Sequence, residues 1–436
     1  MGTEITLDIS GLALDYSKNH MGNDHGALFQ EKDRQRRRSD QVNYEYFIET
    51  NADPAPMEMA FAKPLREVLP RLEVMGFTLK NAETAYQGVL QSVREEMAES
   101  ADDDAEPKEL MGFDEFCDFV TIHAVQSLDD TFISSIDGRD ESQTQGRFSD
   151  KTLTSRIPTP WDVDHWSAYS ERSYFGSLIR ILHPYYLLRI LAGNPENMES
   201  EVVWQYGPLV ENGWASEDQF KPGARRRQTF LIATEGSSDV HILKHAFSIL
   251  RPEIADFFRF IDVNERHPFS GAGNLRNFAE GLAKIDIHNQ TVFLFDNDAE
   301  GVDAFQKVSG LSLPPNMRAM TLPDMDEFRD FPAKGPEGLR RTDINGRAAA
   351  IECYLDLEFN GNSSAQVIWT NLKKDLDVYQ GALESKEGHT KAFLDQSTGS
   401  VASGAYNVNK ISRVLDAIVA ECTAIAESHC CGNLLS

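Results

Sequence analysis

The sequence lacks the features that mark several common classes of protein. It contains no run of about 18 apolar residues, so we expect no membrane-spanning helix. Its first residues are polar and alternating, unlike the basic and apolar segments of a signal peptide, so we expect a cytoplasmic protein. The motif Gly-x-x-x-x-Gly-Lys-Ser/Thr is also missing, which argues against a P-loop ATPase site in this chain.

Cysteine is scarce as well. The five cysteines form no paired Cys-x-x-Cys motif, and two of them stand next to a histidine close to the C-terminus. Free thiols are therefore favoured over a zinc site.

Basic residues are outnumbered: 42 Lys and Arg stand against 69 Asp and Glu, which gives a net charge of -27. This charge argues against a protein that binds polyanions over its whole surface. Two local basic clusters, residues 32–38 and 225–227, are candidates for phosphate contact, with a solvated loop and a domain linker as the respective alternatives. The 436 residues leave room for two to four domains of about 150 residues each.

The most informative stretch holds two short apolar runs that stop abruptly at carboxylates. Residues 230–233 and 292–295 have the continuous hydrophobic character of strands buried on both faces of a parallel sheet. Glu235 follows the first run, and Asp296 and Asp298 follow the second. Because sites in open α/β sheets form outside the carboxyl ends of the strands, we expect these three carboxylates at one edge.

The segments around these runs complete an α/β unit. Ser237 or Ser238 is expected to cap the first helix. The alternation of strands and helices predicts a parallel sheet with right-handed crossovers. In chain order, the predicted elements are a strand at 230–233, a helix at 239–250, a strand at 257–263, a helix at 275–282, a strand at 292–295, a helix at 302–308 and a strand at 318–322.

These residues carry a resemblance to a known domain. A strand ending in Glu-Gly, a Gly-x-Gly-Asn turn and a strand ending in Asp-x-Asp, in this order, resemble the Toprim domain, and Glu235, Asp296 and Asp298 match its acidic positions. Asp239 and Gly301 fit the variant of the OLD (overcoming lysogenization defect) nucleases, written Glu-Gly-x-x-Asp and Asp-x-Asp-x-x-Gly. The resemblance covers roughly 100 residues, a usual size for a small domain, and implies an α/β Toprim domain with a Rossmann-like parallel sheet.

The beginning of the chain resembles the N-terminal region of HEPN/Toprim-associated proteins, a family associated with bacterial defence against phage. The resemblance rests on residues 14–19, 28–29 and 71–79. It implies four segments: an α+β N-terminal region at 1–80, a mostly helical HEPN-like region at 81–222, the Toprim domain at 223–325, and a mostly helical extension at 326–436 that completes the site.

A HEPN ribonuclease site is not expected. HEPN ribonucleases carry an Arg followed four to six residues later by a His, whereas only two residues separate Arg180 from His183. Pro184 is expected to break or kink the apolar helical stretch at residues 166–191. The polar segment at residues 18–26 contains two histidines in no compact metal-binding pattern, so it is interpreted as a surface loop.

Packed carboxylates raise one another's pKa values, and a cation relieves the repulsion. Oxygen ligands of this kind suit Mg²⁺ or Mn²⁺, and residues two apart at the end of a strand can share one face. Asp296 and Asp298 are therefore expected as metal ligands. Glu235 is either a ligand or a general acid/base.

Four further residues are candidates for the same site. Asp239 and Glu352 could serve a second ion, although Glu352 could equally be an exposed residue of a predicted helix. Lys386 and Lys391 resemble the late lysine of OLD-like proteins. Either could stabilise charge in the transition state, and either could be a solvated loop residue.

The sequence thus predicts a metal-dependent Toprim nuclease that hydrolyses DNA or RNA, with transfer RNA among the candidates, as an effector of anti-phage defence. We expect nucleic acid as a partner, together with a partner protein or a phage trigger, no membrane, and a homo-oligomer. The alternative is a non-catalytic nucleic-acid-binding or assembly protein with a structural metal site.

Overall fold

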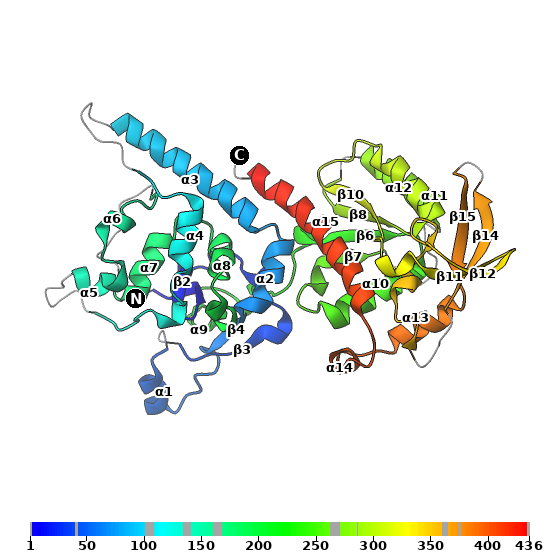
Figure 1. Cartoon of the computed structure of the whole chain (residues 1–436). Helices are drawn as coiled ribbons and strands as arrows, with labels where there is room; N and C mark the ends of the chain where they lie inside the picture. Colours follow the sequence, from blue (N-terminus) through cyan, green and yellow to red (C-terminus); the bar gives the residue numbers. More distant parts are fainter. Residues whose placement is uncertain are drawn as a thin grey trace. The chain divides into compact units, whose positions relative to one another are not determined.

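The computed structural model describes residues 2–39, 42–100, 109–133, 141–159, 168–261, 271–285, 287–359, 365–373 and 376–433. The chain forms two compact units, residues 1–224 and residues 225–429 (Figure 1). The expected segments at 1–80 and 81–222 lie in the first unit, and most of those at 223–325 and 326–436 lie in the second. None of the helices within the described ranges combines the length and apolar character needed to cross a membrane.

The described part of the first unit is built on an antiparallel sheet with the strand order β2-β1-β5-β4-β3. Residues of β1 alternate between buried and half-buried, as their alternating sequence predicts, and Gly11 takes a positive φ of 82° in the turn to β2. The strands are β1 (Glu4–Ile9), β2 (Leu12–Lys18), β3 (Arg34–Arg36), β4 (Met59–Pro64) and β5 (Glu201–Gln205).

Helices surround this sheet. Pro184 stands at the first position of α8, where its missing N–H leaves no hydrogen bond unmade, so the proline breaks the predicted helical stretch instead of kinking it. The short helices α5 and α6 lie between α4 and α7 in the chain. The helices are α1 (Tyr44–Thr50), α2 (Leu65–Val74), α3 (Leu79–Ser100), α4 (Phe113–Thr121), α5 (Glu141–Gln145), α6 (Lys151–Thr154), α7 (Glu171–Ile179), α8 (Pro184–Leu191) and α9 (Gly207–Glu211).

Strand β5 lies within residues 81–222, the region that was expected to be mostly helical. It lies between β1 and β4 in the sheet of the N-terminal region. Its Trp204 is fully buried and stacks on Phe61 of β4 with 6.1 Å between the ring centroids. Because a strand from the second expected segment completes the sheet of the first, the two segments form one core.

The interpretation of residues 18–26 as a surface loop was wrong for His25. This side chain is 3% exposed, and its Nε2 lies 2.8 Å from Asp15 Oδ2. Its Nδ1 lies 3.2 Å from the Tyr185 hydroxyl group. The three side chains form an internal polar chain that links β2 to α8.

In the residues described for the second unit, parallel strands follow the order β10-β8-β6-β7 (Figure 1). The predicted parallel sheet is therefore confirmed. The strand expected at 257–263 is shorter, and residues 262–263 lie outside the described ranges. The strands are β6 (Phe230–Thr234), β7 (Phe258–Phe260), β8 (Gln290–Phe295) and β10 (Met317–Thr321).

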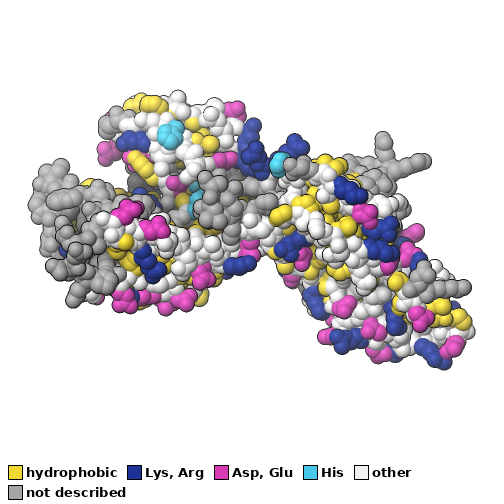
Figure 2. Space-filling view, turned by 90° about the horizontal axis from the view of Figure 1, so that it is seen from above, with side chains coloured by type: hydrophobic (Ala, Val, Ile, Leu, Met, Phe, Trp, Pro, Cys, Tyr) yellow, Lys and Arg dark blue, Asp and Glu magenta, His cyan; other side chains and the backbone are white. Residues whose placement is uncertain are grey.

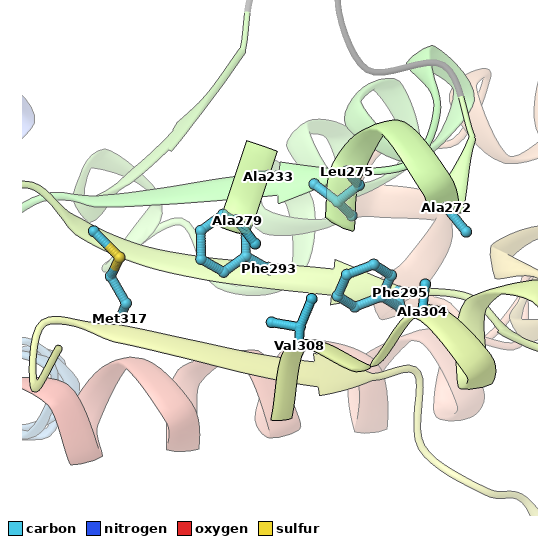
Figure 3. Packing of buried hydrophobic residues seen from close by; sticks show 9 residues of the cluster. All are labelled: Ala233, Ala272, Leu275, Ala279, Phe293, Phe295, Ala304, Val308 and Met317. Atoms are coloured by element: carbon cyan, nitrogen blue, oxygen red, sulfur yellow. The ribbon is translucent and has the colours of Figure 1, made fainter. Parts of the chain in front are cut away.

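Helices α10 (Ser237–Leu250), α11 (Ala272–Ala283) and α12 (Ala299–Ser309) connect these strands. Alternate side chains of the sheet pack with α11 and α12, and Figure 3 shows Phe293 and Phe295 within this cluster. The intervening positions face the opposite side of the sheet. There α10 packs through Phe247, which stacks on Phe258 of β7 at 4.1 Å.

The extension at 326–436, expected to be mostly helical, also carries a sheet with the order β12-β11-β14-β15. Strand β12 is largely exposed and has no hydrophobic alternation to mark it in the sequence. The strands are β11 (Phe331–Gly335), β12 (Gly338–Thr342), β14 (Val367–Lys373) and β15 (Val378–Leu383).

Three helices complete this part of the chain: α13 (Lys386–Leu394), α14 (Thr398–Ala402) and α15 (Asn409–Asn433). A short antiparallel pair, β9 (Asn297–Asp298) and β13 (Ala348–Ala349), joins the extension to the end of the parallel sheet. Helix α15 buries Ile411, Leu415 and Ile418.

Candidate active site

Glu235 follows β6 directly and lies beside the end of β8. The register pairs Thr234 with Leu294, so the residues that follow these positions leave the sheet at the same edge. Glu235 Oε1 accepts a hydrogen bond of 3.0 Å from the backbone N–H of Asp296. The carbonyl group of Glu235 accepts another from the N–H of Gly271, just before α11. The structure therefore brings the two predicted strand ends together.

Asp298 caps a helix, in addition to its predicted role as a metal ligand. Its Oδ1 accepts a hydrogen bond of 2.8 Å from the N–H of Gly301 and so caps the N-terminus of α12. Gly301 itself fills a position with no room for a side chain. A Cβ atom there would lie 2.2 Å from the carbonyl oxygen of Asp296 and 2.9 Å from Glu235 Oε1.

Asp239 lies in the first turn of α10 and is 7% exposed. Its Oδ2 accepts a hydrogen bond of 2.9 Å from the N–H of Gly236, and its Oδ1 accepts one of 3.2 Å from the Ser238 hydroxyl group. The prediction that Ser237 or Ser238 caps this helix was wrong, because the carboxylate of Asp239 reaches back to the N-terminus instead.

Glu352 reaches the site through β13. Ala348 pairs with Asp298, and the 3-10 turn Ile351–Tyr354 follows at once. Glu352 is only 3% exposed, and its negative charge raises the pKa of Asp239. Of the two interpretations left open by the sequence, an exposed helix residue is therefore wrong, and a buried position beside the acidic residues is observed.

Gln380 is a residue of this site that sequence reasoning missed. Its Nε2 donates a hydrogen bond of 2.5 Å to Asp298 Oδ2, and its Oε1 accepts one of 3.2 Å from the N–H of Glu300. It arrives on β15, where the N–H of Gly381 donates to the carbonyl group of Arg347 just before β13. No local sequence pattern signals this role, because it depends on the pairing of distant strands.

The acidic residues of the site share one electrostatic environment. We call Glu235, Asp239, Asp296, Asp298 and Glu352 the carboxylate cluster. Burial raises the pKa of Glu235 to about 8, with neighbouring carboxylates adding to the shift and the Asp296 N–H opposing it. Burial likewise raises the pKa of Asp239 to about 7, with the charge of Glu352 as the next cause.

The two aspartates that follow β8 show the same effect. Burial, followed by the charges of Asp239 and Glu235, raises the pKa of Asp296 well above its ordinary value. Burial also raises the pKa of Asp298, against the hydrogen bonds from Gly301 and Gln380. Desolvation and like charges therefore both favour protonation, and a cation placed among these groups would reverse that preference.

Lys386 and Lys391 line a groove of about 490 Å³ beside the cluster. Lys386 Nζ lies 3.8 Å from Glu352 Oε1, and its charge lowers the pKa of Asp239. Both lysines lie on α13, one turn apart along the helix, instead of in the loop that was the alternative. We call this the lysine groove; it is lined by Ser238, Glu352, Lys386, Glu387, Thr390, Lys391, Leu394 and Asp395.

The chemistry of the carboxylate cluster fits Mg²⁺ or Mn²⁺, because its donors are oxygen atoms and its pKa shifts reflect first burial and then neighbouring negative charge. As placed, however, no three His, Cys, Asp or Glu side chains within the described ranges are arranged to hold a metal ion together. The hydrogen bonds give one reason: they direct oxygens of Asp239 and Asp298 to backbone amides and to Gln380.

Arg180 and His183 of the first unit form no comparable constellation. Burial lowers the pKa of His183 to about 4, and its ring stacks on Phe77 at 5.1 Å. The Nδ1 of His183 accepts a hydrogen bond of 3.2 Å from the N–H of Tyr185 and so caps α8. Arg180 is exposed, so this pair has the geometry of a helix cap and a surface residue.

Comparison with known protein families gives a match to the first part of the chain. The family model described as HEPN/Toprim N-terminal domain 1 matches residues 1–228, which is more than half of the chain. The chain therefore belongs to the HEPN/Toprim family. No curated protein and no solved structure is significantly similar to it.

Proposed function

We propose that the second unit is a Toprim-type nuclease domain that hydrolyses phosphodiester bonds with Mg²⁺ or Mn²⁺. The observation that carries this proposal is the meeting of Glu235 and Asp296 at the carboxyl ends of two parallel strands, with Asp298 two positions further on. Membership of the HEPN/Toprim family supports the same reading, because it makes a nuclease a reasonable function for the chain.

In this proposal, Asp296, Asp298 and Glu235 hold one divalent ion, and Asp239 and Glu352 contribute to a second. A bound ion would supply positive charge to the reacting phosphate and to the attacking water. Binding requires deprotonated carboxylates, so it would displace the protons that the raised pKa values favour in the absence of metal.

The residues of the chain have separate tasks in this reaction. Acid/base catalysis is the alternative to metal binding for Glu235, because a carboxyl group whose pKa is about 8 without metal can accept or give a proton near neutral pH. Lys386, at the edge of the lysine groove, can stabilise charge on the phosphate in the transition state. Gln380 and the N–H of Gly301 fix the orientation of the Asp298 carboxylate.

The test is cleavage by purified protein with EDTA, Mg²⁺ or Mn²⁺. DNA, RNA and transfer RNA are offered in turn, with and without an extract of phage-infected cells, because a defence effector requires its trigger. We expect metal-dependent cleavage of at least one substrate by the wild-type protein and none by the Asp296→Asn/Asp298→Asn variant. Equal cleavage by both proteins would place the catalyst elsewhere.

One observation favours a second candidate, a nucleic-acid-binding or assembly protein without catalysis. The described carboxylates are not arranged as a ready metal site, and several of their oxygens accept hydrogen bonds from the protein. In that case the wild-type protein would bind an oligonucleotide and cleave none under any of these conditions.

A further inference from the structure

A second cavity adjoins the carboxylate cluster on the side of Asp298. It has a volume of about 470 Å³, within the usual range for pockets that hold small ligands. We call it the arginine cavity; it is lined by Ala272, Gly273, Arg276, Ala299, Glu300, Asp303, Ala304, Lys307, Leu372, Lys373 and Leu376. Ala272 and Ala304 lie at the end of the sheet toward which the strand arrows point in Figure 3.

The lining of the arginine cavity carries more basic than acidic side chains. Arg276, Lys307 and Lys373 face Glu300 and Asp303, an excess of positive charge in a protein whose net charge is -27. On the face shown in Figure 2, Lys and Arg side chains are scattered among Asp and Glu side chains. The basic cavity next to the site is therefore a local feature. Inside such a concave site, the positive potential of the side chains is stronger than on an open surface.

The basic side chains of the cavity form only weak or incomplete interactions with neighbouring carboxylates. Lys307 pairs with Asp303 and Lys373 pairs with Glu300, but these ion pairs are half-exposed and exchange partners at little cost. Arg276 Nε is buried and lies 3.4 Å from Glu280 Oε1, yet it donates no hydrogen bond within the described part of the chain. Each cation is thus available to an anion that enters the cavity.

The floor of the cavity adds backbone donors. Helix α11 begins at Ala272 with neither a side-chain cap nor an acidic residue in its first turn. The first N–H groups of such a helix attract anions. Nothing lies within 4 Å of a Cβ built on Gly273, so an incoming group can approach this turn closely.

The cavity lies next to residues that are proposed to take part in the reaction. Glu300 lines the cavity, and Gln380 connects the N–H of Glu300 to the carboxylate of Asp298. The lysine groove adjoins the cluster at Ser238 and Glu352, which are near Asp239. One basic recess therefore adjoins the Asp239 side of the cluster, and another adjoins the Asp298 side.

We propose that the arginine cavity binds a backbone phosphate of the nucleic acid strand, next to the phosphate that lies at the carboxylate cluster. This inference rests on the proposed function for the identity of the strand, but strand binding can be measured without cleavage. Arg276, Lys307 and the N-terminus of α11 hold the phosphate, and the strand continues across the carboxylates toward the lysine groove.

The test compares the Arg276→Gln/Lys307→Gln variant with a Lys284→Gln control. Lys284 is an exposed residue at the C-terminal end of α11 and lies outside the cavity. Binding of a fluorescent single-stranded oligonucleotide is followed by anisotropy in EDTA over a series of salt concentrations. We expect weaker binding by the double variant, with the slope of log K against log salt reduced by about 1 for each lost contact. The control should match the wild type, and thermal melting checks that all three proteins fold.

Cleavage kinetics separate this inference from the proposed function. If the protein is a nuclease, the double variant should show a raised KM with a nearly unchanged kcat. Weaker binding without cleavage by any of the proteins would support the cavity and refute the nuclease. An unchanged salt slope and KM in the double variant would overturn the cavity and leave the nuclease standing. Competition by a free mononucleotide as strong as that by the oligonucleotide would also overturn it, since the site would then recognise no strand.

Discussion

The backbone N–H of Asp296 donates a hydrogen bond of 3.0 Å to the carboxylate of Glu235, 61 positions earlier in the chain. This contact fixes how two strand ends meet, and it also places a second carboxyl group in the same buried space. Burial raises the pKa values of both residues, and the charge of Glu235 adds to the shift of Asp296. Several properties of the protein should depend on this relationship.

Replacing Asp296 by Asn should abolish metal-dependent cleavage without destabilising the metal-free protein. Asn keeps the size of the side chain and removes the charge that burial and the neighbouring carboxylates oppose. Thermal melting in EDTA should therefore give a Tm equal to or above that of the wild type. Added Mn²⁺ should raise the Tm of the wild type alone, because a ligand that binds only the native state stabilises it. A Tm gain of the same size in the variant would contradict the assigned site.

The stability of the metal-free protein should fall as the pH rises from about 5 to 8. The pKa of Glu235 is about 8 in the folded state against 4.5 for an ordinary Glu, so the native state binds more protons than the unfolded state in this window. Linkage then makes the free energy of unfolding decrease with pH. Denaturant unfolding of the wild type and of Glu235→Gln at each pH isolates this group. The wild type should lose more stability than the variant, and parallel curves would show that Glu235 does not titrate in this way.

Gly301→Ala should be harmful, whereas Gly281→Ala should not. A Cβ on Gly301 would overlap the carbonyl oxygen of Asp296 and crowd Glu235, so we expect a loss of about 1–3 kcal/mol, typical of overpacking, together with loss of cleavage. A Cβ on Gly281 of α11 meets nothing within 4 Å, and Ala is the better helix former by about 1 kcal/mol. Urea unfolding of both variants tests the contrast. Equal effects would mean that the space around Gly301 is not restricted.

Lys386→Ala should reduce kcat more than Lys391→Ala does. Lys386 Nζ lies 3.8 Å from Glu352 Oε1 and lowers the pKa of Asp239, whereas Lys391 forms no ion pair with the cluster within the described part of the chain. Loss of a group that stabilises transition-state charge typically lowers kcat by about 100-fold or more. Single-turnover cleavage by the two variants measures the difference. A larger loss in Lys391→Ala would reverse the assignment of the catalytic lysine.

His183→Ala should destabilise the first unit and leave cleavage largely intact. The ring stacks on Phe77 and its Nδ1 caps α8, so its removal should cost about 0.5–2 kcal/mol, as for the loss of a helix cap. Arg180→Ala, at an exposed position, should change neither stability nor cleavage. If folded His183→Ala protein failed to cleave while its Mn²⁺-dependent Tm gain persisted, the first unit would contain a second active site.

The parallel sheet could be predicted because short, continuous sequence patterns specify its strands. The apolar runs at 230–233 and 292–295, and the carboxylates that follow them, are short patterns with one structural reading. The C-terminal sheet could not be predicted, because the exposed β12 shows no alternation. Glu352 and Gln380 depend on the pairing of β13 and β15 with distant segments, and neither residue is marked by its neighbours in sequence. Likewise, His25 is buried only because α8 brings Tyr185 to it.

The connection through β13, β15 and Gln380 has a consequence for how this fold can be divided or recombined. The motif-bearing segment ends near Leu322, but Glu352, Gln380 and Lys386 enter its site from beyond that point. A fragment cut after the last parallel strand would keep every recognisable motif and lose the polar groups that orient Asp298. The module that forms the proposed active site is therefore longer than its sequence motifs. Transfer of the motif-bearing segment alone to another scaffold would leave out Glu352, Gln380 and Lys386.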